Sequence, residues 1–135
     1  VYGPLAAEAF EAARLLAGEG IALRVLNLRT LVPVDDGAIL QAARDTGLLL
    51  TVEDHLVPGG LFSIVAELLV RHGAPARVVP LGLERPFRAA LWTDVLRIEG
   101  FEASRLAARI RVALRAPRGR ALATMPPFRG DFTDA

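Results

Sequence analysis

The sequence lacks cysteine and lysine altogether, and each absence excludes a class of chemistry. All sixteen basic residues among the 135 are arginines. Without a thiol the chain has no disulfide, no thiolate nucleophile and no cysteine-based zinc site. Without lysine it can form neither a Schiff base nor a lysine-containing phosphate loop.

Long hydrophobic runs and a strong net charge are also missing. No apolar run approaches the ~20 residues of a membrane-spanning helix, and no basic start followed by an apolar stretch indicates a signal peptide. The formal net charge of +1 excludes a strong overall electrostatic field. A length of 135 residues favours one domain with a substantial core. We therefore expect a soluble cytoplasmic protein that binds neither membranes nor nucleic acid.

The first third of the sequence predicts a helix, a strand and a second helix. Residues 5–17 place apolar side chains on one stripe and are followed by Gly18 and Gly20, which end helices. Residues 21–28 form an apolar, partly β-branched run that is typical of a strand. Pro33, Asp35 and Asp36 open the next helix, which ends at Gly47.

The same alternation continues through the rest of the domain. Strands are predicted at residues 48–52 and 77–81, and helices at 61–71, 89–98 and 103–115. Repeated strand and helix units of this length favour an α/β fold, with a mainly parallel sheet and helices on both faces.

The two ends of the sequence differ from this pattern. Because the chain enters a helix directly after Pro4, we expect the strand that should precede this helix to be truncated. Each hydrogen bond that neighbouring strands then lack is worth about 0.5–1.5 kcal/mol. Residues 117–135 contain repeated proline and glycine, so we expect a tail, or an arm that reaches another subunit, after a domain spanning residues 1–116.

Glu53, Asp54 and His55 form the one plausible chemical cluster. They are predicted to lie just past the carboxyl end of the strand at 48–52, where open α/β sheets place ligands and interfaces. A histidine beside two carboxylates could act as an acid or base, but no Gly-x-Ser-x-Gly turn supplies a nucleophile. We therefore favour a role in ordering the loop or an interface, with ligand binding and catalysis as alternatives.

Gly59 and Gly60 precede the helix at 61–71 and join the same candidate loop. Backbone N–H groups at a helix start can bind an anion, although a turn alone also requires such residues. The first basic residue on this helix, Arg71, lies at its far end, and His55 and His72 lack the spacing of metal ligands. We predict no catalytic, cofactor-binding or metal-binding residue in this chain, and a candidate interface or ligand loop at residues 53–55 and 59–60.

Seven arginines and no acid occupy residues 103–129. We interpret this segment as a solvated helix face followed by a basic tail, with docking of an acidic partner as the alternative. The aromatic residues Phe87, Trp92 and Phe101 are expected to close the core or an interface. The seven basic residues are Arg105, Arg109, Arg111, Arg115, Arg118, Arg120 and Arg129.

Four segments carry a resemblance to a known family. They read YGPLAAEAFEAARLLAGEGI, VLNLRTLVPVD, LLTVEDH and GGLFSIVAELL. Together they resemble the C-terminal domain of the transketolase family, which includes transketolases, deoxyxylulose phosphate synthase and the beta subunits of 2-oxoacid dehydrogenases. The likeness covers residues 1–82 and weakens from residue 83, and Phe62 stands where the family usually has glycine.

The resemblance implies a three-layer α/β/α domain with a mostly parallel, mixed sheet. It also implies that thiamine diphosphate and magnesium are held by two other domains of the parent enzyme, which carry Gly-Asp-Gly and Asn-Asn motifs. This chain has the single asparagine Asn27, and its one Gly-Asp step at Gly130 is followed by Phe132.

We therefore expect a C-terminal assembly domain of a thiamine diphosphate-dependent, transketolase-type enzyme. Such a domain would support dimerisation or partner docking and would not itself bind the cofactor. The resemblance implies that its partners are other domains or subunits of the parent enzyme, in a homo-oligomer. The alternative is a freestanding interaction or regulatory module with the same fold and no catalysis.

Overall fold

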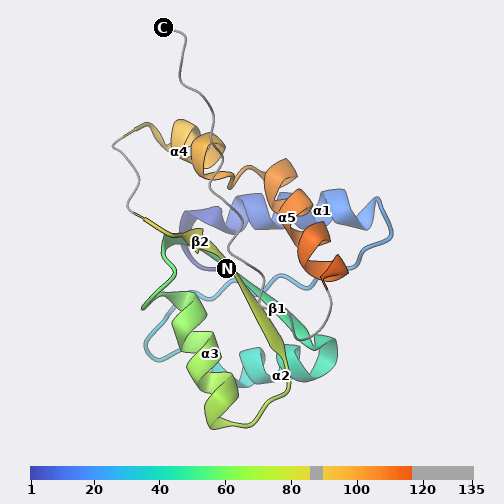
Figure 1. Cartoon of the computed structure of the whole chain (residues 1–135), viewed down its shortest axis with the longest axis vertical. Helices are drawn as coiled ribbons and strands as arrows, with labels where there is room; N and C mark the ends of the chain where they lie inside the picture. Colours follow the sequence, from blue (N-terminus) through green and yellow to red (C-terminus); the bar gives the residue numbers. More distant parts are fainter. Residues whose placement is uncertain (86–89, 117–135) are drawn as a thin grey trace, which may run out of the picture.

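A computed structural model describes residues 1–85 and 90–116 of the chain. Helices surround a two-stranded parallel sheet in these residues, so the predicted α/β class is confirmed (Figure 1). The elements are η1 (Gly3–Leu5), α1 (Ala6–Ala17), α2 (Asp36–Thr46), β1 (Leu48–Leu56), α3 (Leu61–Arg71), β2 (Arg77–Leu83), α4 (Trp92–Glu99) and α5 (Ala103–Arg115).

The two strands run parallel and form the centre of the domain. Leu48 lies opposite Arg77, and the register continues to Val52 before an irregularity interrupts it. Pairing resumes where Leu56 meets Leu83. The parallel direction follows from the crossover through α3, because parallel neighbours require a long connection.

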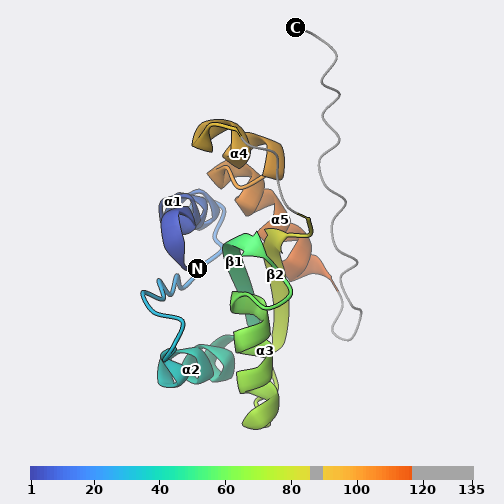
Figure 2. The ribbon, with the colours of Figure 1, turned by 90° about the vertical axis from the view of Figure 1, so that its left-hand side faces the viewer.

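Helices cover both faces of this sheet and give two hydrophobic clusters (Figures 1 and 2). α1 and α5 pack on one face, together with the fully buried Phe101. α2 and α3 pack on the other face through residues such as Ile39 and Val65. Phe101 therefore joins the core as predicted, whereas Trp92 is 41% exposed and Phe87 lies outside the described residues.

The limits of α2 follow from local chemistry that the sequence already indicated. Asp35 accepts a hydrogen bond from the N–H of Ala38 at 2.9 Å, which satisfies a donor that has no partner within the helix. Gly47 ends the helix in the left-handed conformation, with φ 65°. The chain can therefore turn at Gly47 directly into β1.

Residues 21–28 differ from the prediction, because they form no strand. At one end of the segment the Val1 amino group donates to the Leu26 carbonyl and the Leu28 N–H donates to the Val1 carbonyl, both at 2.9 Å. At the other end the Ile21 N–H donates to the Leu16 carbonyl at the end of α1, at 3.0 Å. The apolar pattern does mark a segment that packs on the core, since Leu23 and Val25 lie against the α1 and α5 cluster. A strand also needs a neighbour along its length, and a sequence pattern does not supply one. The sheet in the described residues accordingly contains β1 and β2.

The other predicted helices and strands differ from the observed ones mainly in length. α3 and α5 have the predicted limits, while β1 and β2 extend to Leu56 and Leu83. The predicted tail at 117–135 lies outside the described residues. None of the helices in the described parts of the chain is long and apolar enough to span a membrane.

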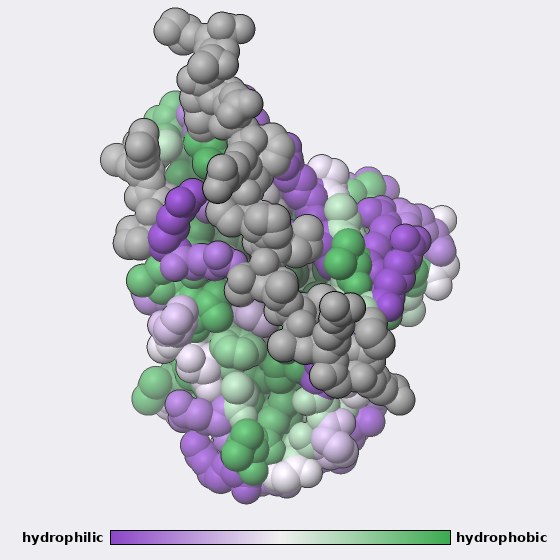
Figure 3. Space-filling view, viewed as in Figure 1, coloured by the Kyte–Doolittle hydropathy of each residue, from purple (hydrophilic) through white to green (hydrophobic). Residues whose placement is uncertain are grey.

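Side chains on the surface are mixed in character. Several apolar residues are exposed, including Val32, Val70 and Leu91 at 90%, 82% and 74%. On the face seen in Figure 3, apolar residues gather in the lower half, over the strands and α3, with charged residues between them. Isolated exposed apolar residues are normal, so none of them alone marks a binding surface.

Candidate functional site at the end of strand β1

Glu53 lies fully buried where β1 approaches the start of α3. Its two carboxylate oxygens accept hydrogen bonds from the backbone N–H groups of Leu61, at 2.6 Å, and Phe62, at 3.0 Å. The first N–H groups of a helix have no partner within the helix and carry partial positive charge. Glu53 therefore caps α3 from eight residues upstream.

The electrostatics of Glu53 reflect this burial. Loss of solvent raises the pKa of the carboxyl group, while the two N–H donors and the nearby His55 act in the opposite direction. Because its pKa in the folded chain exceeds the unfolded value, the folded state binds the proton more tightly. The stabilisation linked to this proton is present at low pH and is lost as the pH rises through the folded pKa.

Two glycines make room for the Glu53 side chain. A Cβ atom on Gly60 would lie 2.0 Å from one carboxylate oxygen and 2.8 Å from the carbonyl oxygen of Leu56. A Cβ atom on Gly82 of β2 would lie 2.8 Å from the Cγ of Glu53. Glycine is favoured at position 59 for a different reason. Its φ of 82° lies in the left-handed region, and nothing lies within 4 Å of the position that a Cβ would take.

Asp54 is half-buried and His55 is exposed, whereas Glu53 is buried. The three residues lie within β1, not past its end, so the predicted loop position is wrong by four residues. The irregularity in register between Val52 and Leu56 turns Glu53 inward while His55 stays exposed. The Nδ1 atom of His55 lies 3.3 Å from the carbonyl oxygen of Leu56.

Asp54 faces the start of the chain. Its Oδ1 atom lies 3.4 Å from the position that a Cβ on Gly3 would take. Together with burial, which is the larger cause, the charge of Asp54 raises the pKa of Tyr2. Asp54 therefore sits beside the entry to η1 and away from any nucleophile.

The start of α3 already has an anionic partner. The N–H groups of Leu61 and Phe62 bond to Glu53, and the N–H of Gly59 donates to Ser63 Oγ at 2.9 Å. An external anion would have to displace a buried carboxylate of the protein itself. Phe62 does not disturb the helix entry, because its backbone supplies one of these two donors.

Within residues 1–85 and 90–116, no group of three histidine, aspartate or glutamate side chains could hold a metal ion. The buried carboxylate of Glu53 has both oxygens engaged by the helix. Glu53 is therefore unavailable as a ligand for a metal-bound diphosphate.

Two of the four arginines of α5 pair with acids of the domain, while the buried Nε of Arg109 has no hydrogen-bond partner. Arg111 forms a bidentate pair with Glu19, and Arg105 lies 3.4 Å from Glu102. Glu8 of α1 accepts a hydrogen bond from the N–H of Ala103 at 2.7 Å and thereby caps α5. The contacts of Glu8 and Glu19 tie α1 and the turn after it to α5, and no sequence signal indicates them because the partners are more than 90 residues apart along the chain.

Comparisons with known proteins agree with this architecture. The sequence model of the family described as "Transketolase, C-terminal domain" matches residues 1–98. The chain is 36% identical, over 137 aligned positions, to 1-deoxy-D-xylulose-5-phosphate synthase of Heliobacterium modesticaldum, covering 96% of this chain and 21% of that protein. It is 42% identical over 71 residues to one of the subunits of apulose-4-phosphate transketolase from Phocaeicola vulgatus, covering 53% of this chain and 23% of that protein.

A solved structure also resembles this chain in both fold and sequence. The chain superimposes with a TM-score of 0.77 and 38% identity on a structure titled "Split gene transketolase, inactive beta4 tetramer", covering 84% of this chain and 37% of that one. The fold and the matched sequence define an α/β domain, and the chain spans about a fifth of the length of the first curated relatives it matches. The chain belongs to the transketolase C-terminal domain family.

Replacing Glu53 by alanine should lower the free energy of unfolding by about 3 kcal/mol, because two buried N–H groups lose their acceptor and a cavity remains. Glu67→Ala, on the exposed side of α3, is the matched control and should change it by less than about 0.5 kcal/mol. Urea denaturation monitored by circular dichroism measures both. Equal midpoints for the two variants would show that the cap is not stabilising.

Gly60→Ala and Gly59→Ala form a second matched pair. Gly60→Ala should cost about 2–4 kcal/mol, because the new Cβ overlaps the Glu53 carboxylate and the Leu56 carbonyl. Gly59→Ala should cost only about 1 kcal/mol, which is the strain of a positive φ in open space. The same denaturation experiment compares them. The reverse order of stability would contradict the tight packing around Glu53.

Proposed function

We propose that this chain is the C-terminal assembly domain of a thiamine diphosphate-dependent, transketolase-type enzyme. In this proposal the domain supports dimerisation or partner docking, and other domains or subunits of the same cytoplasmic enzyme hold the cofactor. The observation that carries the proposal is the use of Glu53 as a helix cap. The most buried acid at the strand end is committed to the fold, which leaves the exposed His55 and the turn beside it for contacts with a partner.

The relatives support the partner part of the proposal. One is named as a subunit of a transketolase, and the solved neighbour is titled as a tetramer of beta chains. Pro58 and Gly59 are exposed next to His55, so a partner can reach this turn without unfolding it. We infer a homo-oligomer that meets other subunits through the exposed part of the candidate interface loop, at His55 and Gly59.

A freestanding interaction or regulatory module is the second candidate. The exposed position of His55 suits a regulatory ligand as well as a protein partner. The two candidates differ at the gene level. The assembly domain requires a linked or neighbouring reading frame with Gly-Asp-Gly and Asn-Asn motifs, and the regulatory module does not.

Calorimetric titration of the 135-residue chain with thiamine diphosphate and magnesium tests whether other domains or subunits are needed to bind the cofactor. We expect no saturable heat at micromolar cofactor, because the described acids offer no metal cluster and Glu53 is already engaged. Clear saturable binding in that range would overturn the proposal. Binding that appears only after the partner chain is added would support it.

His55→Ala should weaken subunit association about tenfold, equivalent to about 1.4 kcal/mol, if this side chain lies in the interface. His72→Ala is the matched control, because His72 is also exposed but lies at the opposite end of α3. Sedimentation velocity over a range of concentrations compares the variants, alongside steady-state kinetics of the assembled enzyme. If turnover collapses while the oligomer stays intact, His55 contacts substrate or reacting groups and the interface assignment is wrong.

A further inference from the structure

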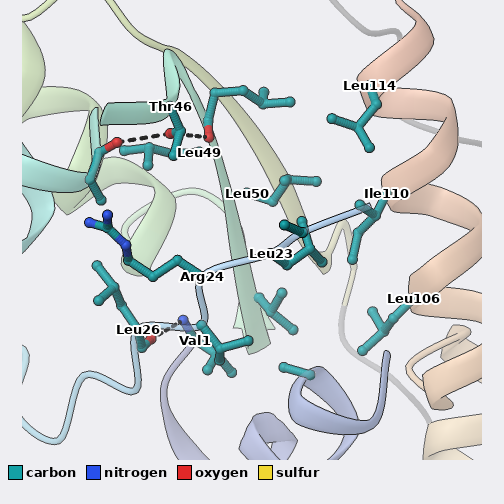
Figure 4. A pocket seen from close by; sticks show the side chains of 16 residues that line it. Val1, Leu23, Arg24, Leu26, Thr46, Leu49, Leu50, Leu106, Ile110 and Leu114 are labelled. Atoms are coloured by element: carbon teal, nitrogen blue, oxygen red, sulfur yellow. Dashed lines mark hydrogen bonds between the residues drawn. The ribbon is translucent and has the colours of Figure 1, made fainter. Parts of the chain in front are cut away.

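The two outer sides of the sheet have different surroundings in the part of the chain that the structure describes. Beyond β1, residues 21–28 lie across a cavity of about 320 Å³, which is lined by Leu23, Leu50 and Ile110 among others (Figure 4). Beyond β2, no further strand is present in residues 1–85 and 90–116. We call the outer side of β2, residues 77–83, the open edge.

Hydrogen bonds at the two ends of β2 show which backbone groups face the open edge. The N–H of Arg77 donates to the carbonyl of Gly47 at 3.0 Å. The carbonyl of Leu83 accepts from the N–H of Val57, also at 3.0 Å. Backbone groups alternate in direction along a strand, so the odd-numbered residues of β2 face β1 and the even-numbered residues face outward. The outward-facing residues are Val78, Pro80 and Gly82.

The open edge has little of the protection that exposed strand edges usually carry. Natural edges are protected by charged side chains, by proline, by bulges or by a covering segment. Residues 78–83 contain no charged side chain, and Gly82 has no side chain to shield its backbone. The irregularity in register adds residues to β1 and leaves β2 regular. Pro80 is therefore the protective feature within this stretch.

Pro80 lies at the centre of the open edge. A second copy of the chain could place its own β2 antiparallel to this edge, as a two-fold symmetric contact. In the register that uses all three outward-facing positions, Val78 lies opposite Gly82 and Pro80 lies opposite Pro80. Such opposed residues exchange two N–H···O bonds, and proline has no N–H to donate. The central pair can therefore form neither bond, and two proline rings meet where the strands should approach.

We propose that Pro80 prevents the open edge of β2 from pairing with the same edge of a second copy, so that the chain associates only through other surfaces. Within its own sheet the proline costs no ladder bond. Pro80 lies opposite Thr51, and the N–H that it lacks would point away from β1. The proposal concerns a different strand from the candidate interface loop and does not depend on the proposed function.

Replacing Pro80 by valine tests the proposal in the full 135-residue chain. Valine supplies the missing N–H and favours β-structure, so the strand should be kept. We expect Pro80→Val to self-associate at least about tenfold more tightly than the native chain, measured by sedimentation velocity over a range of concentrations. Pro75→Val is the matched control, because Pro75 is exposed in the connection between α3 and β2. Unchanged association of Pro80→Val, or equal tightening by Pro75→Val, would overturn the proposal.

Amide hydrogen exchange identifies the surface that associates, and its measurement on the native chain requires no variant. In the native chain the N–H groups of Val78 and Gly82 should be at least about tenfold less protected than those of Val79 and Leu81, which face β1. Protection of Val78 and Gly82 in the native chain equal to that of Val79 and Leu81 would overturn the proposal, because the edge would then already be paired. In Pro80→Val, protection of Val78 and Gly82 should rise with protein concentration. Association of this variant without that protection would also overturn the proposal.

A double variant separates the open edge from the candidate interface loop. The association gained by Pro80→Val should persist when His55→Ala is added, because His55 lies in β1 and not on the open edge. Loss of the gained association in the double variant would assign it to the interface loop and overturn the proposal. The effect of His55→Ala alone tests the proposed function separately.

Discussion

The contact between the Glu53 carboxylate and the start of α3 is the constraint on which this end of the domain depends. It joins the irregular end of β1, the turn at residues 57–60 and the first turn of α3 in one buried interaction. Burying a carboxylate is costly, and hydrogen bonds from two helix N–H groups offset much of that cost. Gly60 and Gly82 are required by the same contact, since each occupies space that a larger residue would take from Glu53.

This use of Glu53 explains why a cluster that reads as chemical in the sequence has a structural role in the fold. A carboxylate whose two oxygens accept from a helix start is held in one orientation and shielded from solvent. His55, two residues later, is exposed and makes only a long contact to a neighbouring carbonyl. Glu53 is fully buried and His55 is exposed, so only His55 of the two is open to solvent at this edge. At this edge the domain exposes His55 and the turn at Pro58 and Gly59.

β1 sets the second constraint. It pairs with β2 along one edge, and Leu48, Leu49 and Leu50 line a cavity of about 320 Å³ and remain half-buried. The helices on both faces are nevertheless in place, held by Phe101 on the α1 and α5 side and by Ile39 on the α2 and α3 side. Contacts between helices, such as the cap that Glu8 provides for α5, therefore position the layers together with the sheet.

The sequence by itself determined the α/β class, the limits of α2, α3 and α5 and the membership of Phe101 in the core. These features depend on local signals: an Asp35 cap, the left-handed Gly47, and apolar residues repeating at helical spacing. Only the tertiary structure decided that 21–28 would lack a sheet neighbour, that β1 would continue through Glu53, and that this acid would cap α3. Each of these outcomes depends on which backbone groups and side chains meet across the fold, and residue patterns along one segment carry no information about the partner that another segment supplies.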